Sequence, residues 1–155
     1  MKLVRYARDS RSPAPKSVKT SYLMSRVRSS GTTPELIVRK LLSSNEIRGY
    51  RLNNPKVSGR PDICLTRAKI AIFIHGCFWH SCPTCVLTLP RHNRKFWSEK
   101  FKANKIRDRR NRLLLKKEGW EVITLWECKI KKGNGRWQRE LLETIKKKYG
   151  KKESN

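Results

Sequence analysis

A thirteen-residue segment constrains this chain more than any other part of it: Phe73-Ile74-His75-Gly76-Cys77-Phe78-Trp79-His80-Ser81-Cys82-Pro83-Thr84-Cys85. It begins inside the apolar run 70–74, which is rich in β-branched residues and typical of a buried strand that delivers side chains to its carboxyl end. The rest of the segment carries three thiols, two imidazoles and an aromatic pair. We therefore predict that a metal site and a reaction centre share this loop.

The thiols predict zinc. Cys77, Cys82 and Cys85 have C-x4-C-x2-C spacing, and Cys128 is the only later cysteine. Four thiolates satisfy the tetrahedral coordination of Zn²⁺ and leave no open position, so the ion would be structural. The alternatives are disulfides or merely buried thiols, but no secretory signal accompanies them. The fifth thiol, Cys64, lies in an apolar run and is predicted to serve packing.

Charge limits the partners of the chain. At 155 residues it has the length of one domain, and 38 Lys and Arg against 12 Asp and Glu give a formal charge of +26. So large an excess favours a polyanionic partner, first of all nucleic acid. A membrane surface is the weaker alternative, because the cations are spread over the chain and no segment is long and apolar enough to span a bilayer.

The chain is predicted to have a flexible basic arm over residues 1–20, a folded domain over 21–149 and a basic tail over 150–155. The arm contains one acid, Asp9, two prolines and no sustained apolar run. It could bind phosphates without sequence preference or be a solvated tail.

Two helices are predicted to open the domain. The first covers Ser21–Arg28. The second begins with Thr33 as N-cap, Pro34 in the first position and Glu35 in the first turn, where a carboxylate could simply complement the helix dipole. Its apolar stripe is predicted to consist of Leu36, Ile37, Leu41 and Leu42.

A hairpin is predicted to create a second metal site. Arg51–Leu52 and Ile63–Leu65 read as strands, and a turn over residues 66–69 leads back into the strand 70–74. Asp62, at the start of one strand, would then meet the carbonyl of Ile74 at the end of its antiparallel neighbour. A carboxylate beside a carbonyl suits a hard cation such as Mg²⁺. The alternative is that Asp62 only caps a turn.

Residues 94–119 predict a long basic helix. Aromatic residues at its start and Leu113 and Leu114 near its end would dock on the sheet, while cations such as Lys100 and Arg109 face phosphates. Asp108 is an isolated acid in this run and is predicted to pair with an arginine at helical spacing. A strand over 120–127 follows. A closing helix buries residues four apart: Trp137, Leu141, Ile145 and Tyr149.

The order of elements predicts an α/β domain with a mixed sheet flanked by helices. Within it, several motifs together resemble the very short patch repair (Vsr) DNA mismatch endonucleases: Gly59-Arg60-Pro61-Asp62, Phe73 to His80, Phe96-Trp97, Arg107-Asp108-Arg109-Arg110, Gly119-Trp120 and Trp126-Glu127-Cys128. The resemblance covers roughly residues 22–137. It implies a restriction-endonuclease-like three-layer fold and a hydrolase that nicks DNA 5′ to the T of T:G mismatches left by 5-methylcytosine deamination.

The resemblance also implies roles for the catalytic residues. Asp62 and the carbonyl of Ile74 would hold a catalytic Mg²⁺, and His80 would be the general base. The supporting positions would be Glu35, His75 and Asp108. The chemistry fits, because phosphodiester hydrolysis needs neutralisation of developing charge and a base that works near pH 7. His92 matches no family position and is expected at the surface.

DNA recognition follows from the same resemblance. Phe78, Trp79 and Trp97 would enter the duplex from the major groove, and Met24 from the minor groove. Unstacking costs least at a mismatch, so an apolar wedge binds preferentially where pairing is already weak. Core packing is the alternative for Phe78 and Trp79.

The resemblance implies structural Zn²⁺, catalytic Mg²⁺, a monomer bound to double-stranded DNA with a T:G mismatch, and a cytoplasmic location in prokaryotes. A zinc-stabilised DNA-binding module without catalysis is a second hypothesis, although a pure binder has no need of Asp62 and His80 at the edge that carries the aromatics. A third is a restriction endonuclease, which would need paired active sites to cut both strands.

Overall fold

A mixed four-stranded sheet forms the centre of the protein. The computed structural model describes residues 16–26, 30–85, 87–133 and 135–150, without the side chains of residues 23–25. The strands lie in the order β1 (Arg51–Leu52), β2 (Ile63–Leu65), β3 (Ile70–His75) and β4 (Glu121–Trp126). β1, β2 and β3 pair antiparallel, and β3 and β4 pair parallel. The predicted hairpin is therefore confirmed.

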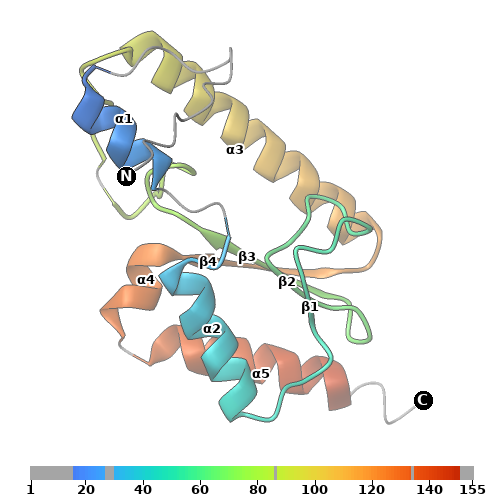
Figure 1. The fold of residues 1–155 in the computed structure, drawn as a ribbon. Helices are drawn as coiled ribbons and strands as arrows, with labels where there is room; N and C mark the ends of the chain where they lie inside the picture. Colours follow the sequence, from blue (N-terminus) through green and yellow to red (C-terminus); the bar gives the residue numbers. More distant parts are fainter. Residues whose placement is uncertain (1–15, 27–29, 86, 134, 151–155) are drawn as a thin grey trace.

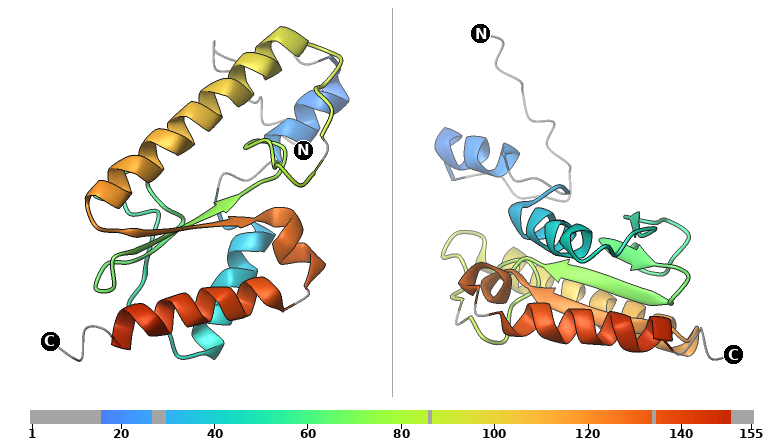
Figure 2. Two further views of the ribbon diagram at one scale, coloured as in Figure 1. Left: turned by 180° about the vertical axis from the view of Figure 1, so that it is seen from behind. Right: turned by 90° about the horizontal axis from the view of Figure 1, so that it is seen from below.

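Helices cover both faces of this sheet. They are α1 (Val18–Ser25), α2 (Thr33–Ser44), α3 (Arg94–Lys117), α4 (Glu127–Lys132) and α5 (Arg136–Gly150). α3 crosses one face, and α2 and α5 lie on the other (Figures 1 and 2). The predicted three-layer, restriction-endonuclease-like α/β architecture is confirmed, and the short α4 is an addition to the prediction. No helix in the described ranges is both long and apolar enough to cross a membrane.

Successive side chains along each strand point to opposite faces of the sheet, and the cores on the two faces differ in size. On the α2 and α5 side, Ile63, Ile72 and Leu125 pack into a large cluster that α5 closes with buried residues Trp137, Leu141 and Ile145. Burial of each such side chain contributes roughly 1.5–3 kcal/mol to the stability of this layer. On the α3 side, the buried core that the described residues form is smaller and consists of Val57, Cys64, Ala71 and Leu115. A small core on that side leaves room for a cleft between α3 and the sheet.

The predicted stripe of α2 was wrong in part. Thr32 is the N-cap, one residue before the predicted Thr33, and the buried residues are Pro34, Val38 and Leu42. Leu36 and Ile37 are 50% and 36% exposed. They lie roughly 200° and 100° around the helix from Val38, so they cannot share the face that it turns to the sheet.

Two other helices also differ from the prediction, α1 in its start and α3 in its buried leucine. α1 begins at Val18, so the last three residues of the predicted arm are helical. Residues 1–15 and 151–155 and the side chain of Met24 lie outside the described part of the chain. In α3, Leu113 and Leu114 are 52% and 42% exposed, and the buried leucine is Leu115.

α3 ends as its sequence predicts. Gly119 has a φ of 78°, and the next backbone N–H, that of Trp120, donates to the carbonyl of Leu115 over 2.9 Å. This left-handed residue and its hydrogen bond are typical of a helix C-terminus that reverses into a strand.

Candidate active site and metal centre

One cleft gathers every candidate catalytic residue. It has a volume of about 910 Å³ and lies between α3 and the sheet. Its lining includes Glu35, Asp62, Ile74, His75, His80 and Asp108. These residues come from α2, the β2–β3 hairpin, the loop after β3 and α3, so the tertiary fold alone brings them together.

Asp62 sits at the edge of the sheet where the hairpin prediction placed it. Its Oδ2 accepts a hydrogen bond of 2.6 Å from the backbone N–H of Ile74. Burial raises the pKa of Asp62 to about 6 despite that hydrogen bond, and the nearby charge of Glu35 raises it further. A buried carboxylate beside a second carboxylate is stabilised in its ionised form by a bound cation, so the residues present fit a divalent metal.

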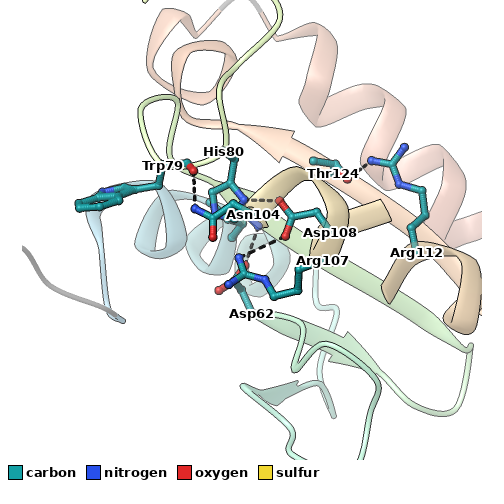
Figure 3. Close-up of polar contacts among 9 residues, drawn as sticks. Asp62, Trp79, His80, Asn104, Arg107, Asp108, Arg112 and Thr124 are labelled. Carbon is teal, nitrogen blue, oxygen red and sulfur yellow. Dashed lines mark hydrogen bonds and ion pairs between the residues drawn. The ribbon is translucent and has the colours of Figure 1, made fainter. Parts of the chain in front are cut away.

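Asp108 pairs with His80. Oδ2 of Asp108 lies 2.6 Å from Nδ1 of His80 (Figure 3). The predicted partner, an arginine at helical spacing, was wrong: the only ion pair of Asp108 with an arginine among the described residues is with the adjacent Arg107, at 3.3 Å. Burial would raise the pKa of Asp108, but the His80 hydrogen bond and the nearby positive charges lower it. An ionised Asp108 accepts from Nδ1, which leaves Nε2 of a neutral His80 as the basic atom.

His75 supports the ring of His80. It is 7% exposed, and its ring stacks on that of His80 with centroids 3.9 Å apart and planes 10° apart. Burial, aided by His80, lowers the pKa of His75 to about 4, so it is neutral near pH 7. The donor atoms of His75, His80 and Asp108 lie within 4.8 Å of one another. Stacked parallel rings direct their lone pairs side by side rather than at one point, so this trio suits proton transfer better than chelation.

Glu35 caps the start of α2 from within the cleft. It accepts hydrogen bonds from the backbone N–H of Gly31 at 2.9 Å and from the hydroxyl of Thr32 at 2.8 Å. Glu35 therefore stabilises the N-terminus of α2, as the sequence predicted. Because the carboxylate also lines the cleft and acts on the pKa of Asp62, the same residue bears on the electrostatics of the site.

The four predicted thiols form one cluster. The Sγ atoms of Cys77, Cys82, Cys85 and Cys128 lie within 4.8 Å of one another, and Cys82 and Cys128 are 3.8 Å apart. All five cysteines are free, so the disulfide alternative was wrong. Cys64 is fully buried in the small core, as predicted.

Backbone N–H groups surround these sulfurs. That of Cys128 lies 3.4 Å from Sγ of Cys77. Those of Thr84 and Cys85 donate to Cys82 and, against the effect of burial, lower its pKa to about 7. Four converging sulfurs with N–H donors around them fit a thiolate-bound ion such as Zn²⁺. The cluster joins the loop after β3 to the start of α4.

Comparison with known proteins identifies the family of the chain. The model of the family described as DNA mismatch endonuclease Vsr matches residues 15–85. The type II nicking enzyme V.NmeAIP of Neisseria meningitidis is 44% identical over 115 residues, which cover 73% of this chain and 80% of that enzyme. This chain belongs to the Vsr family. As a Vsr-family protein it is a DNA endonuclease, and therefore a hydrolase.

Other Vsr relatives match in the same way. The type II nicking enzyme V.XorIIP of Xanthomonas oryzae is 41% identical over 109 residues, covering 70% of this chain and 79% of the relative. The DNA mismatch endonuclease Vsr of Escherichia coli is 37% identical over 82 residues, which cover 53% of each chain.

The three aromatic residues predicted to recognise DNA, Phe78, Trp79 and Trp97, form a cluster with Phe101 outside both cores. The ring of Phe78 lies 5.2 Å from Trp79, 5.2 Å from Trp97 and 5.1 Å from Phe101. Trp79 and Trp97 are 5.7 Å apart. All four rings are half-buried. His92 is exposed as expected, and so are the basic residues Lys100 and Arg109 of α3.

Sequence reasoning missed a polar stripe on α3. The side-chain amide of Asn104, 6% exposed, donates to the carbonyl of Trp79 over 2.8 Å. Asp108 follows four residues later, and four residues beyond it Arg112 donates to Oγ1 of Thr124 over 3.1 Å (Figure 3). The spacing of four was visible in the sequence, but polar residues in a basic helix give no sign that they face inward.

Proposed function

We propose that this Vsr-family endonuclease nicks double-stranded DNA on the 5′ side of the T in a T:G mismatch and depends on Mg²⁺. The observation that carries the proposal is that Asp62 and the His80–Asp108 pair line one cleft beside the aromatic cluster. Two relatives named as nicking enzymes and one named as a mismatch endonuclease support the same reading.

His80 is the proposed general base. Its Nδ1 is engaged by Asp108, so Nε2 accepts a proton from the attacking water. The carboxylate of Asp108 stabilises the imidazolium that forms, as an acidic partner does for a catalytic histidine elsewhere. The neutral ring of His75, stacked on His80, restricts its rotation without adding a competing positive charge.

Asp62 and the carbonyl of Ile74 are the proposed ligands of Mg²⁺. The buried carboxylate forms no ion pair in the described part of the chain, and Glu35 adds negative charge nearby. When bound, Mg²⁺ supplies neutralisation of the charge that develops on the phosphate. The four thiolates would hold Zn²⁺ as a structural ion that ties the loop carrying His80 to α4.

The aromatic cluster is the proposed recognition element. Phe78, Trp79 and Trp97 present adjacent half-buried rings next to the cleft, and a T:G pair is where such rings can enter a duplex at the lowest unstacking cost. Met24 is proposed to act from the minor groove, and the cations of α3, including Lys100 and Arg109, to neutralise phosphates. One set of these catalytic side chains is sufficient for a nick, so the proposed enzyme acts as a monomer.

Incubation with Mg²⁺ and duplexes labelled on either strand tests this function. The expected result is one nick, beside the T of a T:G duplex, with much slower cleavage of a C:G duplex and no cleavage by the Asp62→Ala variant. Tight binding of T:G DNA without any cleavage would support a DNA-binding module instead. Cleavage of both strands in paired DNA would support a restriction endonuclease.

A further inference from the structure

Three inward contacts follow one another along α3. Asn104 holds the carbonyl of Trp79, Asp108 holds the ring of His80, and Arg112 holds the hydroxyl of Thr124. The three residues are spaced by four, so they share one face of the helix and lie about 6 Å apart along its axis. The first contact serves the recognition loop and the second serves the general base. The third contact, that of Arg112 with Thr124, serves neither of them.

A hydrogen bond orients the guanidinium of Arg112, but no carboxylate in the described part of the chain pairs with its charge. Arg112 lines the same cleft as Asp62 and His80. Thr124 accepts from one N–H of its guanidinium. A guanidinium has five donors in a planar fork, so the remaining donors can bind a phosphate in a bidentate manner. The hydroxyl of Thr124 orients that fork.

The sheet register separates Arg112 from the metal-binding edge. Phe73 of β3 pairs with Thr124 of β4, and Asp62 lies opposite Phe73, one residue beyond the pair formed by Ile63 and Ile72. Thr124 is therefore two strand spacings from Asp62, roughly 10 Å. Figure 3 shows Arg112 and Thr124 set apart from the group formed by Asp62, His80 and Asp108. The guanidinium is therefore held beside β4, on the opposite side of β3 from Asp62, a position suited to a different phosphate from the one that a cation on Asp62 would bind.

We propose that Arg112, oriented by Thr124, binds the backbone phosphate next to the scissile phosphate on its 5′ side in the cut strand. This inference rests on the proposed function. The contact of Asn104 with Trp79 places the mismatch at the N-terminal end of the stripe, and Arg112 lies on the opposite side of the general base. The spacing of these three residues along α3 thus sets the distances between the mismatch, the scissile phosphate and the neighbouring phosphate.

A scan with neutral methylphosphonates tests this assignment. T:G duplexes carry one methylphosphonate at a time on either strand, and their affinity is measured without divalent cations, so the readout does not require nicking. For the wild-type protein, the substitution at the second phosphate 5′ of the mismatched T should weaken binding several-fold. Arg112→Ala should bind the unmodified duplex more weakly, with a salt slope reduced by about one, and should lose no further affinity at that position.

Two further variants make the result specific. Lys117→Ala removes the same charge from an exposed residue of α3 that does not line the cleft, and it should stay sensitive to that methylphosphonate. Thr124→Val keeps the charge but not its orienting hydroxyl, and should show a partial form of the Arg112→Ala result.

Equal sensitivity of wild type and Arg112→Ala at every phosphate would overturn the proposal and leave Arg112 as a brace between α3 and β4. The proposal would also be overturned if the position at which Arg112→Ala alone loses no affinity were a phosphate of the uncut strand. A parallel nicking assay keeps the two proposals apart, because absent nicking or absent T:G preference refutes the proposed function, whereas the methylphosphonate scan alone decides the phosphate contact.

Discussion

Nδ1 of His80 lies 2.6 Å from Oδ2 of Asp108, although 28 residues separate the two in the chain. The contact joins the loop after β3 to the middle of α3 across the cleft. It fixes which nitrogen of His80 is available as a base, because the carboxylate requires a proton on the nitrogen that it faces.

Asp108→Asn should slow nicking by about 10²–10⁴-fold, the usual contribution of a positioned base. The amide keeps the size of the side chain but loses the charge that stabilises an imidazolium. Single-turnover nicking of a T:G duplex measures the effect, and affinity for the duplex should change little. Glu99→Gln, which neutralises an exposed acid of the same helix, is the matched control. If Asp108→Asn nicked within about threefold of wild type, His80 would not depend on this partner.

Recognition and chemistry should separate by mutation. Asp62→Ala and His80→Ala should abolish nicking and largely preserve affinity for T:G DNA, because both act on the scissile phosphate. Trp79→Ala should instead reduce the preference for T:G over C:G, since stacking on an aromatic ring contributes on the order of 1–3 kcal/mol per base. Binding and single-turnover assays on both duplexes give the two readouts. If Asp62→Ala nicked at nearly the wild-type rate in Mg²⁺, the proposed metal site would be wrong. If Trp79→Ala kept the full preference for T:G, the Trp79 ring would serve packing and not recognition.

Purified protein should contain about one zinc per chain, and Cys128→Ala should lose it together with thermal stability. The remaining three thiolates cannot close a tetrahedral site, and the loop that carries His80 would lose its tie to α4. Metal analysis and thermal unfolding measure both effects. Cys64→Ala is the control, because Cys64 is buried away from the cluster and its loss should leave the zinc content unchanged. Protein that contains no zinc would refute this assignment.

Asp62→Asn should stabilise the protein in magnesium-free buffer. Burial raises the pKa of Asp62 from 3.8 to about 6, so the folded protein holds this proton more tightly than the unfolded chain. Its contribution to the free energy of unfolding is therefore greatest below pH 3.8 and is lost as the pH rises through about 6. At pH 8 the neutral amide avoids this cost and should raise the free energy of unfolding by roughly 1–3 kcal/mol.

That gain should shrink as the pH falls from 8 to 5, and Mg²⁺ should reduce it by stabilising the wild-type carboxylate. Denaturant titrations of both proteins at several pH values measure it. His75 shifts stability in the opposite direction, because burial lowers its pKa from 6.5 to about 4 and stability is lost as the pH falls through that interval. Only the difference between variant and wild type therefore isolates Asp62. A variant less stable than wild type at pH 8 would contradict the prediction.

Several features of the site could be predicted because they depend on residues close together in the sequence. The spacing of Cys77, Cys82 and Cys85 fits one tetrahedral ion, and a four-residue turn pairs β2 with β3 and brings Asp62 to Ile74. The period of the closing helix likewise identified its buried residues, because α5 lies on the large core and each inward position is apolar.

The sequence by itself therefore determined the strands, the hairpin edge and the thiol cluster, where local periodicity and spacing carry the information. Only the tertiary structure decided the partner of Asp108, the stacking of His75 on His80 and the inward face of α3. α3 spans a cleft rather than a full apolar core, so polar Asn104, Asp108 and Arg112 occupy positions that amphipathic patterning assigns to solvent, while Leu113 and Leu114 are exposed. Hydrogen-bond partners distant in sequence are chosen by how the elements pack, and no local pattern encodes that choice.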